Sequence, residues 1–392
     1  MRHFDVLDPP VRSALFAREP RPFTADSQTE LLGLGLGATL YMPGTRPALA
    51  ADITARAAAG VISVVVCLED AVADQDVQTA EQNVVQHLRT VAAGSGRGDP
   101  PLIFVRVRTP NQVVDLVDRL GPAASRLTGF VLPKFTAAAA PDWFAAIAAA
   151  ELAAGVPVRC MPVLESGAVM YGETRHRELL DVAAVLDQHR ERVVAVRLGA
   201  TDLLGLYALR RGRGVNIYDV AVVRDLLAAV VNVLGRADGS GFVLTGPVWE
   251  HFPVPERLFK PQLRTTLFAG DPHGQRRRHA LILADHDELL REVVLDKANG
   301  LYGKTVIHPS HVAPVHALLV VSHEEYADAL AISEATGGGA SRSSYRNKMN
   351  EAGPHSAWAR TTLRRAELFG VSRPDRGVID VLAALSGHPL VG

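Results

Sequence analysis

The chain has 392 residues, 48% of them hydrophobic, and a formal net charge of −1. This length and apolar content allow a large buried core, and an α/β barrel with extensions reaches this size. The nearly balanced charge argues against nucleic-acid binding and against a membrane-surface role, because both favour an excess of basic residues.

Two further features predict a cytoplasmic protein. The N-terminal stretch has no apolar run of signal-peptide length, and no segment is long enough to span a bilayer. The two cysteines, Cys67 and Cys160, fall inside apolar segments that are predicted to be buried strands. Reduced, packed thiols are typical of cytoplasmic proteins, so we expect no disulfide.

Short apolar strands alternate with helical segments along most of the chain. The predicted strands span 38–43, 61–69, 102–108, 129–135, 158–165, 193–199, 241–247 and 304–309, and helices are predicted at 48–59, 142–154, 220–234 and 285–300. Continuous apolar strands that alternate with helices indicate a parallel sheet covered on both faces. Eight such units predict an α/β fold with a closed (β/α)8 TIM barrel rather than an open doubly wound sheet.

Extensions are predicted on both sides of the barrel. Residues 1–36 are rich in proline and charge and form an N-terminal extension, the catalytic barrel spans 37–325, and a C-terminal helical extension spans 326–392. Helices are expected over 361–370 and 378–387, and a Gly/Ser-rich loop over 337–360. We interpret this loop as a lid over the site or an arm across a subunit boundary, and a flexible linker is the alternative.

Charged side chains follow most of the predicted strands. In a barrel, active groups come from the C-terminal ends of the strands, and charges are costly to bury without partners. A concentration of charge at this rim therefore predicts a functional site. The residues are Arg46 after the first strand, Glu69 and Asp70 after the second, Arg106 and Arg108 on the third, Lys134 on the fourth, Glu165 on the fifth and Asp202 after the sixth.

Glu165 and Asp202 are the candidate metal ligands, because each ends one of two neighbouring strands. Mg²⁺ takes oxygen ligands, keeps several waters and is commonly held by one or two carboxylates together with the substrate. The alternative is that both carboxylates pair with Arg or Lys at the rim.

Three cations accompany the carboxylates. Arg106 and Arg108 are two positions apart on a strand, so they are expected to point the same way. A guanidinium could hold a substrate carboxylate or an enolate oxygen, and a structural ion pair with Glu69 or Asp70 is the alternative. Lys134 could form a Schiff base, but beside a metal site we favour an ion pair.

Seven motifs in order make the chain similar to a known family. They are LYMPGTRP, VVVCLEDAV, FVRVR, VLPKF, VLESG, LGATDLLG and GKTVIHPSHV. Over about residues 38–325 they resemble the citrate lyase beta-subunit / malyl-CoA lyase family of the HpcH/HpaI aldolase/citrate lyase superfamily. The chain looks closest to the longer subfamily of C–C bond lyases.

The resemblance implies a Mg²⁺-dependent barrel enzyme that makes or breaks a carbon–carbon bond next to a carbonyl. It implies a 3-hydroxy acid or acyl-CoA-like substrate, an oxo-acid product and a homo-oligomer, either a trimer or a hexamer. By position, Glu165 and Asp202 would bind Mg²⁺, Arg106 would stabilise the enolate, and Glu69 and Asp70 would organise a metal-bound water and Arg106. The residues implied to contact the substrate are Arg46, Arg108, Lys134, Gly199, Ala200 and Thr201.

The sequence departs from the family pattern at three places. Thr201 stands where the family usually has Glu, and Arg108 where it often has Asn. Where the family has a C-terminal Asp, this chain has Asn350 and Glu351. Either Glu351 takes the acid/base role or the usual thioester chemistry does not apply. The alternatives are an acyl thioester hydrolase that uses the same metal site, and a non-catalytic barrel that binds a ligand.

Overall fold

The computed structural model describes residues 1–94, 101–252, 286–335 and 338–387. Its described residues divide into two compact units, one with residues 24–94, 101–252 and 291–312 and the other with residues 2–23, 286–290, 313–335 and 338–387. The sequence-based division at residues 36 and 325 stays a prediction. None of the described helices is long and apolar enough to cross a membrane.

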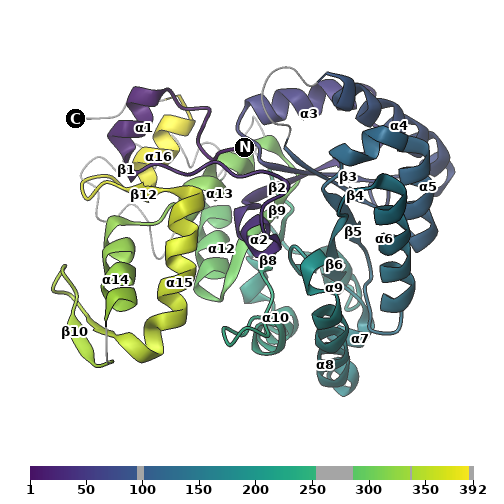
Figure 1. The fold of residues 1–392 in the computed structure, drawn as a ribbon. Helices are drawn as coiled ribbons and strands as arrows, with labels where there is room; N and C mark the ends of the chain where they lie inside the picture. Colours follow the sequence, from purple (N-terminus) through teal and green to yellow (C-terminus); the bar gives the residue numbers. More distant parts are fainter. Residues whose placement is uncertain (95–100, 253–285, 336–337, 388–392) are drawn as a thin grey trace. The chain divides into compact units, whose positions relative to one another are not determined.

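The first unit is built on eight parallel strands in the order β7-β6-β5-β4-β3-β2-β9-β8 (Figure 1). Each of them lies within or overlaps one of the predicted strands. Their bounds are β2 (Ala38–Pro43), β3 (Ser63–Cys67), β4 (Leu102–Arg106), β5 (Gly129–Leu132), β6 (Arg159–Leu164), β7 (Arg197–Leu198), β8 (Leu244–Trp249) and β9 (Leu301–Val306).

Backbone hydrogen bonds between the two edges close this sheet into a barrel. Val196, just before β7, forms a parallel bridge with Leu244 of β8. The Val196 N–H donates to the Val243 carbonyl at 2.8 Å, and the Thr245 N–H donates to the Val196 carbonyl at 3.1 Å. The predicted TIM barrel is therefore confirmed.

Helices follow the strands and cover the outside of the sheet. The predicted helices at 48–59, 142–154 and 220–234 are confirmed, and so is the described part of the helix at 285–300. In α5, Val113, Leu116, Val117 and Leu120 are buried at the 3–4 residue spacing of an amphipathic helix. The helices are α2 (Thr29–Gly35), α3 (Leu49–Ala58), α4 (Val77–Ala93), α5 (Pro110–Leu120), α6 (Ala140–Ala154), α7 (Gly167–Met170), α8 (Gly172–Gln188), α9 (Ala200–Gly205), α10 (Ala221–Leu234) and α12 (Asp287–Ala298), with 3₁₀ turns at η1 (Asp74–Asp76), η2 (Gly121–Arg126), η3 (Arg190–Arg192), η4 (Ile217–Asp219) and η5 (Pro309–His311).

The core of this unit is apolar, with a few buried charges. Both cysteines are buried and neither forms a disulfide, as expected. On β9, Lys304 faces α12, where its Nζ lies 2.7 Å from carboxylate oxygens of both Glu292 and Asp296. A buried ammonium needs such partners, because an unpaired charge is costly to remove from water.

The second unit contains helices and two small antiparallel sheets. Strands β1 and β12 pair with one another, and β10 and β11 form a hairpin. The elements are α1 (Pro9–Leu15), β1 (Phe16–Arg18), α13 (Val312–Leu319), α14 (His323–Glu334), β10 (Ala340–Arg342), β11 (Met349–Glu351), α15 (Ala352–Phe369), β12 (Val371–Ser372) and α16 (Val378–Leu385).

The prediction of a loop at 337–360 is wrong for most of the described residues in this range. Residues 340–351 form the hairpin β10–β11, and residues 352–360 are the start of α15. Pro354 lies in the first turn of α15, where a proline does not interrupt helical hydrogen bonds. Asp328 of α14 fixes the hairpin, since its carboxylate accepts hydrogen bonds from Ser343 at 2.7 Å and Asn350 at 2.8 Å.

Candidate active site

Five predicted charged residues lie at the carboxyl ends of five adjacent strands. Glu69 follows β3, Arg106 ends β4, Lys134 follows β5, Glu165 follows β6 and Asp202 lies in α9 directly after β7. Apolar residues fix the strands in the sheet, and the charged residues come where each strand leaves it. The barrel thus gathers these charges at one rim, as the sequence predicts.

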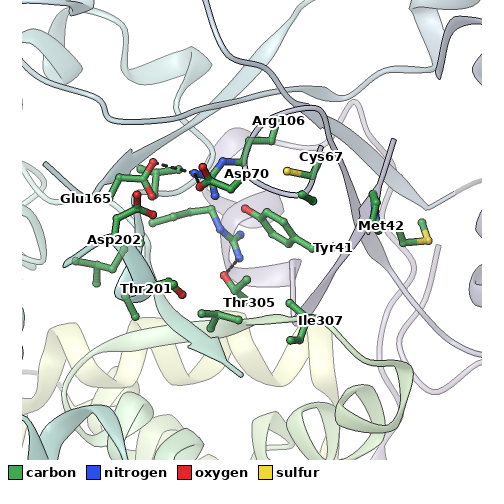
Figure 2. A pocket seen from close by; sticks show the side chains of 18 residues that line it. Tyr41, Met42, Cys67, Asp70, Arg106, Glu165, Thr201, Asp202, Thr305 and Ile307 are labelled. Carbon is green, nitrogen blue, oxygen red and sulfur yellow. Dashed lines mark hydrogen bonds and ion pairs between the residues drawn. The ribbon is translucent and has the colours of Figure 1, made fainter. Parts of the chain in front are cut away.

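Arg106 is the centre of the charge network. Its Nη2 lies 2.7 Å from Glu69 Oε2, 3.0 Å from Glu165 Oε1 and 3.3 Å from Asp70 Oδ2. In Figure 2, the side chain points toward Glu165 and Asp70. Burial alone would lower the pKa of Arg106, but the neighbouring carboxylates outweigh it and raise the pKa. The guanidinium is therefore a fixed positive charge.

Glu165 is a buried carboxylate, and one of its two oxygens has no hydrogen-bond partner among the described residues. Its Oε1 accepts hydrogen bonds from Arg106 and from the Lys134 backbone N–H at 2.8 Å. Its Oε2 is buried and has no hydrogen-bond partner among the described residues. Burial raises the pKa of Glu165 to about 7, and repulsion from Asp202 acts in the same direction, although Arg106 opposes both.

Gly199 is the residue that makes room for this carboxylate. A Cβ at position 199 would lie 1.9 Å from Glu165 Oε2 and 2.5 Å from Glu165 Cβ. Such distances are far below van der Waals contact, so only glycine fits here with the present backbone. Lys134 contributes a second backbone feature, since its φ of 47° is unusual for a non-glycine residue and accompanies the hydrogen bond to Glu165.

Glu69, Asp70 and Lys134 form a second part of the network. Lys134 Nζ lies 2.5 Å from Glu69 Oε1, so the favoured ion pair is present. Burial would raise the pKa of Glu69, but hydrogen bonding to Asp70 and the charge of Arg106 lower it to about 2. Burial and the neighbouring Glu69 raise the pKa of Asp70 to about 6. Asp70 is therefore the carboxyl of this pair that takes up a proton first.

The rim opens into a cavity of about 330 Å³, which is in the size range of small-molecule sites. Figure 2 shows several of the residues that line it. The cavity contains seven of the predicted site residues, Asp70, Arg106, Glu165, Gly199, Ala200, Thr201 and Asp202. Glu69, Lys134 and Arg108 line a neighbouring polar hollow of about 460 Å³, and Asp70 lines both spaces.

Three predicted site residues have other surroundings. Arg108 donates to the Leu68 carbonyl at 2.8 Å and pairs with Asp74 at 2.6 Å, so it holds the loop after β3. Arg46 pairs with Asp52 on α3 at 2.5 Å and does not line the cavity. Glu351 precedes α15 in the second unit, where its N–H donates to His355 at 3.1 Å. Substrate contact by Arg46 and Arg108 and catalysis by Glu351 stay predictions.

Three residues that line the cavity are not identified by the sequence patterns, and one acid at a strand end lies beside it. Tyr41, Arg197 and Thr305 line it, and Glu250 accepts a hydrogen bond from Thr201 Oγ1 at 2.9 Å. Arg197 is a single charge within the apolar run VVAVRLG, and that isolation was the available signal. Glu250 follows β8, where the rule of strand ends predicts a charged residue.

The donor set fits a cation that takes few protein ligands. Within residues 1–94, 101–252, 286–335 and 338–387, no three His, Cys, Asp or Glu side chains group as a metal site. Glu165 Oε2 is open, and the negative charge of Asp202 acts on Glu165. Two carboxylates with spare oxygens suit Mg²⁺, which keeps several waters, better than a metal held by a complete protein cage.

Solved structures with the same fold include two citrate lyase proteins. CitE from Mycobacterium tuberculosis, in complex with magnesium, acetoacetate and coenzyme A, is 22% identical, and the match covers 85% of this chain and 99% of that one with a TM-score of 0.50. A citrate lyase from Burkholderia xenovorans is 18% identical, and the match covers 89% and 96% with a TM-score of 0.58. These likenesses show a shared fold. No curated protein matches the chain.

A protein-family model provides the assignment. The model described as C-C bond lyase of the TIM-barrel fold matches residues 30–371. This range includes every residue of the rim network and most of the chain. The predicted family and the predicted class of carbon–carbon lyase are thus confirmed, and this chain belongs to the C-C bond lyases of the TIM-barrel fold.

Proposed function

We propose that the protein is a Mg²⁺-dependent lyase that cleaves a 3-hydroxy acid or an acyl-CoA-like substrate beside a carbonyl, giving an oxo acid and an enolate. The observation that carries this proposal is the open Oε2 of buried Glu165 beside Arg106 at the mouth of the barrel. A buried carboxylate oxygen without a partner is costly, and a bound cation would satisfy it.

Glu165 and Asp202 would hold Mg²⁺. When bound, the ion supplies Lewis acidity to a carbonyl oxygen and a template for the oxo acid. Gly199 keeps the space beside Glu165 Oε2 clear of side-chain atoms. The likeness to CitE supports this proposal only through the fold, and the magnesium, acetoacetate and coenzyme A of that structure are the ligand classes we propose here.

Arg106 would stabilise the enolate. Its Nη2 is occupied by carboxylates, but its Nε is buried without a hydrogen-bond partner among the described residues. Arg106 also lines the cavity, so its Nε can donate to an oxygen that becomes negative during cleavage. Removal of one such donor costs about 10²–10³ in kcat.

Asp70 is suited to proton transfer. It lines the cavity, and its pKa of about 6 lies close to neutral pH, where a group both gives and takes protons efficiently. Glu69 holds Arg106 and Lys134 in place through its two oxygens. We propose Asp70 as the group that exchanges a proton with substrate or product, and Glu69 as a positioning residue.

The test is cleavage of a panel of 3-hydroxy acids and their CoA thioesters with Mg²⁺, with oxo-acid release as the readout. We expect EDTA and Glu165→Gln each to abolish release, while the exposed control Glu173→Gln retains it. Cleavage that is unchanged by both EDTA and Glu165→Gln would overturn the proposal. A free acid with an intact carbon skeleton would show a thioester hydrolase instead.

We further propose a homo-oligomer, a trimer or a hexamer, in the cytoplasm. Family membership and the single-chain site geometry do not depend on this assembly. Light scattering coupled to size-exclusion chromatography measures the mass in solution, with 42.0 kDa for one chain. A mass equal to one chain at micromolar concentration would contradict the proposal.

A further inference from the structure

Arg197 lies deep in the same cavity. Among the described residues, its guanidinium contacts neutral groups. It is 1% exposed, and it lines the cavity together with Tyr41 and Thr305. Its Nη2 donates to Thr305 Oγ1, and its Nη1 lies 3.4 Å from Thr39 Oγ1 and 3.5 Å from Met161 Sδ. Its Nε is buried and has no hydrogen-bond partner within the described part of the chain.

Other buried cations of this unit are neutralised by carboxylates. Arg211, also nearly inaccessible, lies 2.8 Å from Glu292, and Lys304 lies 2.7 Å from Glu292 and Asp296. No described carboxylate forms an ion pair with Arg197, and Arg106 adds repulsion to the cost of burial, so the pKa of Arg197 is lowered. A buried, uncompensated charge is expensive, so a ligand group of opposite charge at this position would bind favourably.

The position of Arg197 in β7 defines where a negatively charged group of a ligand would bind. Arg197 lies in β7, and Gly199 follows it just after the strand ends, so Arg197 lies about 6.6 Å farther from the rim along the chain. Gly199 lies against Glu165 at the rim. The cavity therefore has carboxylates at its mouth and a guanidinium at its floor, and an elongated molecule is needed to reach both.

We propose that Arg197 binds a second carboxylate of the substrate at the floor of the cavity, so that the substrate class is a dicarboxylic oxo acid or its hydroxy-acid precursor. This inference rests on the proposed function, in which the Mg²⁺ that Glu165 and Asp202 would hold takes the carbonyl end of the oxo acid at the rim. The free Nε and a neighbouring Nη of a guanidinium match the two oxygens of a carboxylate. The hydroxyls of Tyr41 and Thr305 adjoin this position and add polar contacts.

The test compares two acids that differ only at the far end. Oxaloacetate has a carboxylate where 2-oxobutyrate has a methyl group. Calorimetric titration with fresh solutions and Mg²⁺ is expected to give at least tenfold tighter binding of oxaloacetate to the wild type. In Arg197→Met this preference disappears, while the affinity for 2-oxobutyrate stays within about threefold. Equal affinities in the wild type, or a preference retained in Arg197→Met, would overturn the proposal.

Thermal unfolding without ligand separates a binding role from a structural one. Arg197→Met removes an uncompensated charge and is expected to unfold at the same or a higher temperature, while Arg211→Met breaks an ion pair and unfolds at a lower one. An equal fall in both variants would assign Arg197 a structural role. If 2-oxobutyrate binds without any requirement for Mg²⁺, the proposed function fails. If binding requires Mg²⁺ but the wild type shows no preference for oxaloacetate, only the role of Arg197 is refuted.

Discussion

Replacement of Gly199 by alanine is the most direct test of how the site is built. The new methyl group would lie 1.9 Å from Oε2, 2.5 Å from Cβ and 2.9 Å from Cδ of Glu165. Rotation of the Glu165 side chain could move Oε2 away, but Cβ is attached to the backbone. The clash is therefore relieved only if the ends of β6 and β7 move apart, although the Gly199 N–H donates to the Leu164 carbonyl at 3.2 Å.

The expected cost has two components. Forcing a methyl group into a packed site typically costs about 1–3 kcal/mol of stability, and backbone involvement favours the upper part of this range. Separation of the two positions by about 1 Å also displaces Glu165 from Arg106 and Asp202. A misplacement of this size can reduce activity by about 10²-fold, so Gly199→Ala is expected to lose Mg²⁺ affinity and oxo-acid release more than stability.

Gly205→Ala is the matched control, because Gly205 ends the same helix α9 and a Cβ there would meet nothing within 4 Å. This control is expected to retain Mg²⁺ affinity and activity, with stability equal or higher by up to about 1 kcal/mol. Urea unfolding, Mg²⁺ calorimetry and oxo-acid release are measured on both variants. Wild-type Mg²⁺ affinity in Gly199→Ala would show that the close packing around Glu165 is not needed for the site.

Three other changes test separate features. Because its ion pair raises the pKa of Lys134, borohydride treatment with an oxo acid is expected to give no lysine adduct by mass spectrometry. Lys304→Met leaves Glu292 and Asp296 without their shared cation, and urea unfolding should show a loss of about 3–5 kcal/mol. Burial and a neighbouring histidine place the pKa of His316 well below 6.5, so the unfolded chain binds a proton that the folded chain rejects. Below pH 6.5, His316 is expected to lower stability by up to about 1.4 kcal/mol per pH unit, and His316→Leu should reduce the slope measured by urea unfolding by that amount.

The barrel and its rim are predictable from the sequence because both depend on local patterns. Continuous apolar runs mark strands that are buried on both faces, and the change to charged residues marks their ends. For this reason the sequence alone assigns Glu165, Asp202 and Arg106 to one site. Their positions depend on where each strand ends, and an apolar run marks each of the eight strands.

Partners beyond the ends of strands are harder to predict. Arg106 and Arg108 share strand parity, but β4 ends at Arg106, so the parity rule no longer applies to Arg108. Beyond the strand end, the Arg108 side chain donates hydrogen bonds to carbonyls of the loop after β3, including that of Val72. The contact between Arg197 and Thr305 joins residues 108 positions apart in the chain. Such a contact joins side chains of two different strands inside the barrel, and no local pattern encodes which residues meet there.

The departure at Thr201 is best understood from its neighbours in space. A glutamate at this position would bring another carboxylate beside Asp202, whereas Thr201 instead donates a hydrogen bond to Glu250 at the end of β8. Glu250 also lies 3.4 Å from Arg211, whose guanidinium is fixed by Glu292. A carboxylate therefore remains next to α9, but it belongs to Glu250 after β8, and Arg211 is its ion-pair partner. The loss of glutamate from the family motif thus removes a side chain from α9 without removing negative charge from the rim.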